Sequence, residues 1–443
     1  MNYENTLAFA KQLDSVDPLR SYRDKFYFPQ LKGRDVIYFT GNSLGLQPKT
    51  VQDNILNELE DWASFGVEGH FHSRKPWLSY HEQFAVPISK LVGAWPEEVV
   101  VMNQLTVNLH LLMVSFYRPT KQRFKIICEA KAFPSDQYAL ETQVQFHGFK
   151  AADSIVEVAP REGEYCIRHE DILSAIEKNK NELALVMIGG VNYYTGQVFD
   201  MKSITEAGHK AGAIVGFDLA HAAGNIKLHL HDWNVDFACW CSYKYLNSGP
   251  GSVAGAFINA IHLNEKDLPR FAGWWGHDKV TRFKMEKGFV PMKTAEAWQL
   301  SNAPVLSMAA HKAALDIFTD AGMDELVTKS EKLTGYLEFI IEEINDKRSA
   351  KSETSPFGGQ TIPKGPLRGN DKLEIITPKN NAERGCQLSI IAHSKGKSLH
   401  DSLTTAGVIS DWREPNVIRC APVPLYNSFE DAWRFGDILK NAL

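Results

Sequence analysis

Short runs of hydrophobic residues alternate with segments of helical periodicity through the middle of the chain. The runs that predict buried strands lie at 99–102, 125–128, 154–158, 183–188, 213–217, 236–241 and 254–258. Helical periodicity separates several of them, at 106–116, at 135–144, from Arg168 onward and from Met201 onward. Strands that are hydrophobic on both faces and separated by helices are typical of a parallel sheet covered on both sides. Ligands of such α/β sheets bind beyond the carboxyl ends of the strands.

The last third of the chain has a different pattern. Helical periodicity at 304–321 and 323–344 leads into a segment at 346–384 that is rich in Lys, Ser, Pro and Gly. Such a composition predicts a partly exposed connection, here around one strand at 373–376. The remaining strands are predicted at 387–391 and 417–421, and the remaining helices near 399–406 and from Phe429. These elements predict a smaller α+β domain.

The predicted elements divide the chain into three parts. Residues 46–305 form a large α/β domain with a mainly parallel sheet, and residues 306–443 form the smaller C-terminal domain. The first 45 residues contain no series of strands and are expected to pack on the small domain. A chain of 443 residues is long enough for two domains, and its 44% of hydrophobic residues can form a sizeable core.

Composition excludes several classes of partner. A formal net charge of −5 without blocks of like charge predicts no binding to nucleic acid or to a membrane surface. No hydrophobic run approaches the length of a membrane span, and the first 20 residues are too polar for a signal peptide. The six cysteines are scattered, which is typical of free thiols in a reducing compartment. We therefore expect a cytoplasmic protein.

Asp218 and Lys244 are the most informative pair in the sequence. They lie 26 residues apart, and each follows a predicted parallel strand, so both are expected at the same edge of the sheet. A lysine amine can form a Schiff base with the aldehyde of pyridoxal 5'-phosphate (PLP). A carboxylate can hold the pyridine nitrogen of that cofactor in its protonated form. A lysine after a strand is by itself usually an ordinary surface residue, but the pair predicts a PLP site.

Several motifs resemble those of the kynureninase family. They are Gly-Asn-Ser-Leu-Gly at 41–45, Asn-Gln-Leu-Thr-Val-Asn at 103–108, Phe-Pro-Ser-Asp at 133–136, Tyr-Tyr-Thr-Gly-Gln at 193–197, Cys-Ser-Tyr-Lys-Tyr-Leu-Asn at 241–247 and Ala-Pro-Val-Pro-Leu-Tyr-Asn at 421–427. Each motif alone is weak, but together they extend in order from about Tyr38 to the C-terminus. The resemblance implies a fold-type I PLP enzyme that is a homodimer. It also implies hydrolysis of L-kynurenine or 3-hydroxy-L-kynurenine to anthranilate or 3-hydroxyanthranilate plus L-alanine.

The cofactor phosphate is expected at the turn that contains Leu105 and Thr106. Free amides and a hydroxyl at a helix N-terminus favour an anion. The alternative is that Thr106 is only the N-cap of the helix. By resemblance, Tyr243 and Trp274 also contact the phosphate, although the loop around Trp274 could equally be an ordinary packed aromatic loop.

Three further residues are assigned to the cofactor ring. By resemblance, Phe133 stacks on the ring, and Asp136 joins Asp218 near its nitrogen, where two carboxylates hold a cation more firmly than one. Asp136 could instead be an acidic residue that the helix dipole favours. By resemblance, His221 also faces the cofactor, with a core or capping histidine as the alternative. The family often has a hydroxyl residue at the position of Gly189, so any contact from that position is expected to come from the backbone or to be absent.

Substrate recognition requires a cation for the α-carboxylate and polar groups for the aryl end. Arg419 resembles the carboxylate anchor of the family, and a planar guanidinium suits that role. Ser43, His70 and Asn302 match positions that line the aryl pocket, and Asn302 is also expected to contact the cofactor. Since His and Asn can bond a ring hydroxyl, we expect 3-hydroxykynurenine to be used at least as well as kynurenine.

Lys244 and Tyr243 are the predicted catalytic residues. We expect Lys244 to take the Cα proton, and Tyr243 to move protons at the carbonyl and at Cβ or else only to bind the phosphate. No metal is expected, because the histidine pairs 70/72 and 229/231 lack further ligands nearby. The alternatives are another fold-type I enzyme such as a cysteine desulfurase or transaminase, a non-catalytic PLP-binding protein, and a nicotinamide enzyme. A nicotinamide enzyme would need a glycine-rich motif at its first strand-to-helix turn, and this sequence has none there.

Overall fold

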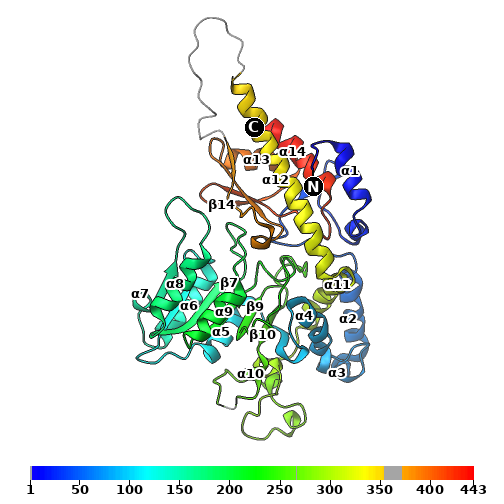
Figure 1. The fold of residues 1–443 in the computed structure, drawn as a ribbon. Coiled ribbons are helices and arrows are strands. Elements are labelled where there is room, and N and C mark those ends of the chain that lie inside the picture. The colour runs from blue at the N-terminus through cyan, green and yellow to red at the C-terminus, as the bar shows by residue number, and fades with distance from the viewer. Residues whose placement is uncertain (1, 266, 354–371) are drawn as a thin grey trace, which may run out of the picture. The chain divides into compact units, whose positions relative to one another are not determined.

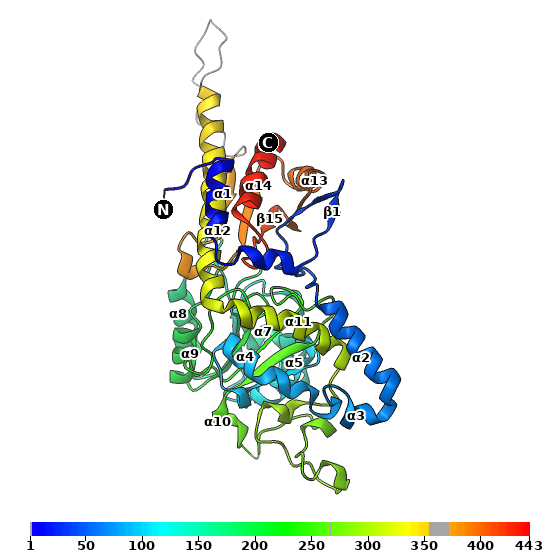
Figure 2. The same ribbon diagram turned by 90° about the vertical axis from the view of Figure 1, so that its right-hand side faces the viewer.

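The computed structural model describes residues 2–265, 267–353 and 372–443. The chain divides into two compact units (Figures 1 and 2). Unit 1 comprises Met1–Gln47, Tyr194–Gln197 and Asp324–Leu443, and unit 2 comprises Pro48–Tyr193 and Val198–Met323. Among the described residues, no helix has the length and hydrophobicity that crossing a membrane requires.

Unit 2 contains a seven-stranded, mainly parallel sheet, as the hydrophobic runs predict. Its strands are β4 (Val99–Met102), β5 (Lys125–Glu129), β6 (Ile155–Val158), β7 (Leu183–Gly189), β8 (Ile214–Asp218), β9 (Phe237–Trp240) and β10 (Ala254–Ile258). The strand order is β4-β10-β9-β8-β7-β5-β6. β10 is antiparallel to both of its neighbours, and the other pairings are parallel. The carboxyl ends of β5, β7 and β8 are therefore adjacent at one edge.

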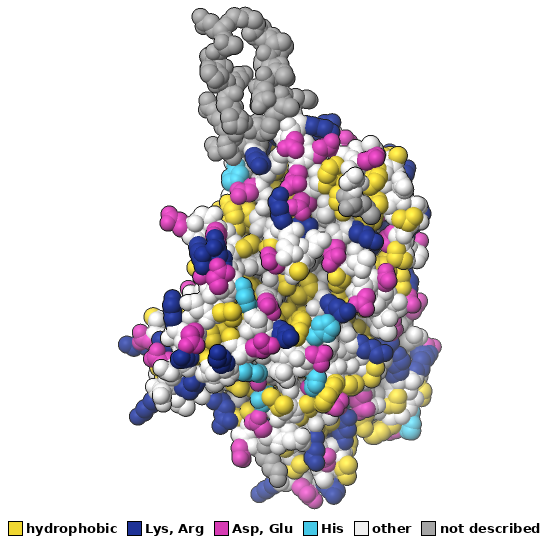
Figure 3. Space-filling model, in the orientation of Figure 1, with side chains coloured by type: hydrophobic (Ala, Val, Ile, Leu, Met, Phe, Trp, Pro, Cys, Tyr) yellow, Lys and Arg dark blue, Asp and Glu magenta, His cyan; other side chains and the backbone are white. Residues whose placement is uncertain are grey.

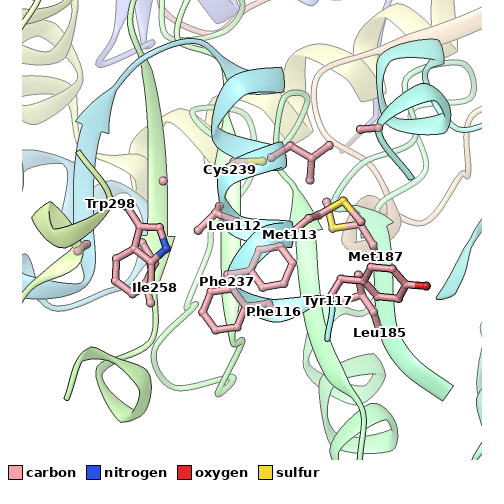
Figure 4. Packing of buried hydrophobic residues seen from close by; sticks show 14 of the residues in the cluster. Leu112, Met113, Phe116, Tyr117, Leu185, Met187, Phe237, Cys239, Ile258 and Trp298 are labelled. Atoms are coloured by element: carbon pink, nitrogen blue, oxygen red, sulfur yellow. The ribbon is translucent and has the colours of Figure 1, made fainter. Parts of the chain in front are cut away.

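Helices cover both faces of this sheet. On one face, α5 (Leu105–Phe116) and α6 (Pro134–Phe146) supply buried side chains that pack on β5, β7 and β9. Figure 4 shows Phe116 beside Phe237, with ring centroids 4.8 Å apart. On the other face, α9 (Met201–Lys210) approaches so closely that a Cβ at Gly208 would lie 2.4 Å from a methyl of Val215. Hydrophobic burial on both faces stabilises the sheet, so a ligand can reach it only at the strand ends.

The remaining helices of unit 2 are α2 (Val51–Phe65), α3 (Gly69–His72), α4 (Ala85–Val92), α7 (Ala151–Ser154), α8 (His169–Asn179), α10 (Ala260–Leu263) and α11 (Val305–Ala321). α11 is followed by its C-cap residue Gly322, whose φ of 74° favours a residue without a side chain. On the face drawn in Figure 3, side chains of both charges are interspersed.

Unit 1 is built on a four-stranded antiparallel sheet. Its strand order is β11 (Leu373–Ile375), β12 (Leu388–Ala392), β15 (Val417–Cys420) and β14 (Asp411–Arg413). The helices of this unit are α1 (Leu7–Ser15), α12 (Met323–Glu353), α13 (Lys397–Thr405) and α14 (Phe429–Ala442). Side chains from all four helices and from the sheet form one hydrophobic core. A capping box of Ser428 and Asp431 fixes the start of α14.

Two expectations for unit 1 are corrected. The N-terminal segment does contain strands, β1 (Gln30–Leu31), β2 (Arg34–Asp35) and β3 (Ile37–Tyr38), and β3 pairs in parallel with β13 (Val408–Ile409). A strand of two residues leaves no alternating pattern to detect. The helix predicted to end at Ile344 continues to Glu353, through the first part of the expected connection. Residues 354–371 of that connection lie outside the described residues.

Candidate active site

A cavity of about 310 Å³ opens in unit 2 at the carboxyl ends of β5, β7 and β8. Its lining contains residues that the sequence assigned to the cofactor, namely Leu105, Thr106, Phe133, Asp136, Asp218, His221, Tyr243 and Lys244. It also contains Gly189 and residues that were not assigned to the site, among them Glu129, Tyr193 and Ser252. The position agrees with the rule that α/β sheets bind ligands beyond the carboxyl ends of their strands.

The N-terminus of α5 forms one side of the cavity. Asn103 adopts a left-handed conformation with φ 47°, and Asn108 fixes the turn by donating to the carbonyl of Met102 at 3.0 Å. The N-cap residue is Gln104, whose side chain does not cap the helix, so the interpretation of Thr106 as the N-cap is wrong. The first-turn amides therefore point toward the cavity with the positive end of the helix dipole, an arrangement that favours a phosphate.

Asp136 and Asp218 form a buried, hydrogen-bonded carboxyl pair. Asp218 ends β8 and accepts a 2.6 Å hydrogen bond from the amide of Ala220, and Asp136 lies in the first turn of α6. Burial raises the pKa of both carboxyls, and the charge of Asp218 raises the pKa of Asp136 further. Two adjacent carboxyls that resist ionisation are well suited to a cation between or beside them.

Glu129 is a third buried carboxyl in the lining, and the sequence analysis missed it. It is the last residue of β5, and both of its carboxylate oxygens lie 3.2 Å from the amide nitrogen of Gly189, which donates to them. Burial raises the pKa of Glu129 to about 7. The signal that could have found it is its position, since an acidic residue directly after a hydrophobic parallel strand is expected at the ligand-binding edge.

A tight loop after β9 holds Lys244. The amide of Asn247 donates to the Lys244 carbonyl at 3.0 Å, and the amide of Ser248 donates to the Ser242 carbonyl at 3.0 Å. Lys244 is only 8% exposed. Its Nζ lies 5.6 Å from the ring centroid of Phe133 and 5.8 Å from that of Tyr243. The amine therefore lies near two aromatic rings of the cavity lining.

The remaining lining residues add aromatic and hydroxyl groups. The ring of Phe133 meets that of Tyr193 edge-on, with centroids 5.3 Å apart. His221 is buried and lines the cavity, as its assignment to the cofactor requires. The hydroxyl of Ser252 is buried and has no hydrogen-bond partner in the described part of the chain. An unpaired buried hydroxyl facing a cavity is typical of a ligand site.

Together these groups fit PLP. The helix N-terminus suits a phosphate, Phe133 offers a ring face, the carboxyl pair suits a protonated ring nitrogen, and Lys244 offers an amine for the aldehyde. In the described residues no lysine, arginine or histidine forms an ion pair with Glu129, Asp136 or Asp218. The charge of Lys244 lowers the pKa of Asp218, and a cationic ring nitrogen would add a second positive charge.

Arg419 and Ser43, which the sequence assigned to the substrate, come together in unit 1. Arg419 lies on β15 and is 1% exposed. Its Nη2 donates to the Ser43 hydroxyl at 3.1 Å and forms an ion pair with Asp411. Arg413 also pairs with Asp411, at 3.1 Å. Arg419 is therefore a structured, compensated cation and not a solvated surface residue.

His70, Trp274 and Asn302 are absent from the cavity lining. Nδ1 of His70 lies 2.9 Å from the carbonyl of Val67. Trp274 is 45% exposed, and its indole donates to the carbonyl of Arg282 at 3.3 Å. Asn302 is exposed. Their assigned roles stay predictions.

One cluster has the composition of a metal site. His81, Glu82 and Glu296 bring their ligand atoms together, and within the described ranges they form the one such group. Nζ of Lys279 already lies 2.8 Å from Glu82 and 3.1 Å from Glu296. An ammonium group therefore occupies the position that a cation would take. In the histidine pair 229/231, Nδ1 of His231 lies 2.8 Å from the Glu98 carboxylate.

Comparisons with known proteins identify the family. The model of the aminotransferase class-V family matches residues 37–357, and that of the kynureninase C-terminal domain matches residues 366–439. The chain is 59% identical to a kynureninase of Flavobacterium psychrophilum over 100% of its length and 99% of that protein. It is 48% identical to a kynureninase of Nematostella vectensis, over 98% of this chain and 93% of that protein.

The solved structures show the fold alone. A cysteine desulfurase from Thermococcus onnurineus superposes with a TM-score of 0.72 at 15% identity, and the match covers 97% of each chain. The desulfurase alternative is not favoured. Cys386 and Cys420 are both buried, and burial raises the pKa of the Cys420 thiol, so neither is a reactive thiol on an exposed loop. The chain belongs to the kynureninase family, the fold-type I, PLP-dependent hydrolases that act on carbon–carbon bonds.

Proposed function

We propose that this protein hydrolyses the Cβ–Cγ bond of L-kynurenine or 3-hydroxy-L-kynurenine. The products are anthranilate or 3-hydroxyanthranilate and L-alanine. The observation that carries the proposal is one cavity that contains the amine of Lys244, the carboxyl pair Asp136–Asp218 and the free N-terminus of α5. The full-length identity to kynureninases supports the choice of substrate.

The chain binds its cofactor by four kinds of contact. The amides of Leu105 and Thr106 would hold the phosphate, Phe133 would pack on the ring, and Lys244 would supply the amine for the aldehyde. Asp218, supported by Asp136, keeps the ring nitrogen protonated. When bound, PLP supplies an electron sink that stabilises negative charge on the substrate carbons.

Lys244 is the base for the Cα proton. Its amine lies inside the cavity, and in the described residues it forms no ion pair with a carboxylate. It can therefore accept a proton. Tyr243 is the acid–base group at the γ-carbonyl and at Cβ. Burial raises the pKa of the Tyr243 phenol, and Cys241 raises it further. The phenol is therefore neutral and can donate a proton.

The two roles considered for Tyr243 can be separated. Tyr243→Phe removes the hydroxyl and keeps the ring. We expect kcat to fall by about 10²-fold while cofactor affinity is kept, because the lost group transfers protons. Weaker cofactor binding with unchanged kcat would instead assign Tyr243 to the phosphate. Tyr193→Phe, in the same lining, is the matched control.

Arg419 binds the substrate α-carboxylate, assisted by the Ser43 hydroxyl. His70 and Asn302 are assigned to the aryl end, where they hydrogen-bond the ring hydroxyl of 3-hydroxykynurenine. We therefore expect kcat/KM for 3-hydroxykynurenine to equal or exceed that for kynurenine. A much larger kcat/KM for kynurenine would exclude this assignment.

A homodimer in the cytoplasm is part of the proposal. Leu56, Leu59, Trp62 and Phe65 recur every three residues along α2 and are all exposed, Trp62 by 61%. Val67 and Phe71 extend this hydrophobic stripe beyond the helix. Such a surface is typical of an interface between subunits. Light scattering after size-exclusion chromatography tests it, and a monomer at micromolar concentration would exclude it.

One assay tests the proposed reaction. The purified protein is given PLP, its visible absorbance is recorded, and L-kynurenine is added while anthranilate fluorescence is followed. We expect a Schiff-base absorbance band that Lys244→Ala lacks, and a rise in fluorescence that requires Lys244. Lys210→Ala, an exposed lysine on α9, is the matched control. Sulfide release from L-cysteine without anthranilate release would favour a desulfurase instead.

A further inference from the structure

Glu129 is a buried carboxyl that the proposed chemistry does not use. It is 5% exposed, it ends β5, and it lines the same cavity as the Asp136–Asp218 pair. Its hydrogen-bond donor is the amide of Gly189 at the end of β7, and Gly189 pairs in register with Asp218 on β8. Three adjacent strands therefore bring Glu129 and Asp218 to one edge of the sheet.

The surroundings of Glu129 contain little positive charge. The titratable groups near it are the carboxyls of Asp136 and Asp218, the thiols of Cys128 and Cys239, and the amine of Lys244, with His221 on the same cavity wall. The charge of Asp218 raises the pKa of Glu129, and the charge of Glu129 in turn raises the pKa of Asp136. The ionisation of any one of these carboxyls thus affects the others.

The Glu129 carboxyl can occupy its observed position because residue 189 is a glycine. A Cβ at residue 189 would lie 3.0 Å from Oε1 of Glu129 and 3.5 Å from the carbonyl of Val191. The absence of a side chain at 189 also means that only the backbone amide bonds the carboxylate from this strand.

We propose that Glu129 is a third carboxyl of the cofactor site, a positioning residue that sets how much negative charge the Asp136–Asp218 pair presents to the cofactor ring nitrogen. When Glu129 is ionised, the cluster attracts a cationic ring more strongly. When Glu129 is protonated, only the aspartate pair acts. The proposal rests on cofactor binding and not on the identity of the substrate.

Cofactor affinity at two pH values tests this directly. Pyridoxal phosphate is titrated into the apo-protein, and the dissociation constant is read from quenching of tryptophan fluorescence. Glu129→Gln keeps an oxygen for the Gly189 amide and removes the charge. We expect equal affinities of wild type and variant near pH 6, and about threefold to tenfold tighter binding by wild type near pH 8.5. Taking the ratio cancels the titration of the cofactor itself.

Two further variants make the result decisive. Glu157→Gln removes an exposed carboxylate opposite Cys128 on β6, outside the cavity, and should behave as wild type. In Gly189→Ser the Glu129 carboxyl must move by a few tenths of an ångström to admit the new Cβ, and the hydroxyl placed beside it stabilises the ionised form, so the pH at which affinity rises should move lower. A ratio that does not change with pH, or an equal effect of Glu157→Gln, overturns the proposal. If Glu129→Gln does not fold, an unmoved midpoint in Gly189→Ser overturns it instead.

Since the readout is cofactor affinity, failure here would leave the hydrolysis of kynurenines untouched. Failure of the hydrolysis assay with normal cofactor titrations would leave the role of Glu129 untouched.

Discussion

Two buried sites with charged side chains, one in each unit, differ in how the chain balances their charge. In unit 1, the charge of Arg419 is balanced by its own chain, through an ion pair with Asp411 and a hydrogen bond with Ser43. In unit 2, Glu129, Asp136 and Asp218 share one cavity, and in the described residues no basic side chain forms an ion pair with them. Burial raises the pKa of all three.

The difference indicates which charge a ligand must bring to each site. Isolated buried charges are costly, so a chain normally pairs them, as it does for Arg419. The charge of Lys244 lowers the pKa of Asp218, but burial has the larger effect and raises the pKa of all three carboxyls, so the cluster is stable only if it keeps protons or gains a further cation. The ring nitrogen of PLP is such a cation. Arg419, in contrast, already has a carboxylate partner in Asp411, and under the proposed function the substrate carboxylate would take that position.

The largest effect is expected from neutralising the centre of the acidic cluster. Asp218→Asn keeps the shape of the side chain and removes its charge, so the ring nitrogen loses its main partner. We expect kcat/KM for kynurenine to fall by about 10³-fold, with a smaller loss of cofactor affinity. Asp232→Asn, at an exposed position, serves as the control. Activity within tenfold of wild type would remove Asp218 from the chemistry.

A smaller effect is expected at the compensated cation. Arg419→Lys keeps the charge and loses the planar fork that binds a carboxylate by two hydrogen bonds. We expect kcat/KM to fall by roughly 10- to 100-fold, mainly through KM. Arg413→Lys changes the second arginine on Asp411 and should have little effect. Equal losses in the two variants would mean that the ion-pair network, and not carboxylate binding, is what Arg419 provides.

The smallest effect concerns the stability of the apo-protein. Because the pKa of Glu129 is raised to about 7, its neutral form is favoured in the folded state, and stability is lost as the pH rises from the usual glutamate range through 7. Glu129→Gln should therefore raise the Tm of the apo-protein by roughly 2–6 °C near pH 8 and leave it unchanged near pH 4. Thermal unfolding at both pH values measures this. A Tm gain that is the same at both would show that charge is not the cause.

The sequence predicted the parts of the fold that depend on local hydrophobic pattern. The bounds of β4 and β10 agree with their hydrophobic runs, and the carboxyl ends of β7 and β8 differ from the predicted ends by one residue. The same difference of one residue occurs at β5, where it decides whether Glu129 belongs to the strand. The hydrophobic run stops at Cys128, but the strand continues through Glu129, because backbone pairing with β6 does not depend on the polarity of the side chain.

Other features depend on contacts that no local pattern encodes. β3 pairs with β13, which lies about 370 residues further along the chain, so its two residues gave no periodic signal. The cofactor residues Phe133, Asp136 and Lys244 were predicted from motifs and strand ends, and all line the cavity. His70, Trp274 and Asn302 were assigned by resemblance alone, and in a single chain they lie outside that lining. Asp411 was not predicted, because only the fold of unit 1 brings it to Arg419.

The central claim is that the carboxyl cluster of unit 2 exists to hold a cationic ring nitrogen. Nitrogen NMR of the protein reconstituted with ring-¹⁵N-labelled cofactor reports the protonation of that atom directly. We expect a protonated nitrogen from about pH 6 to about pH 9 in the wild type, and loss of the proton in Asp218→Asn. A ring nitrogen that is unprotonated in the wild-type protein near neutral pH would contradict the account.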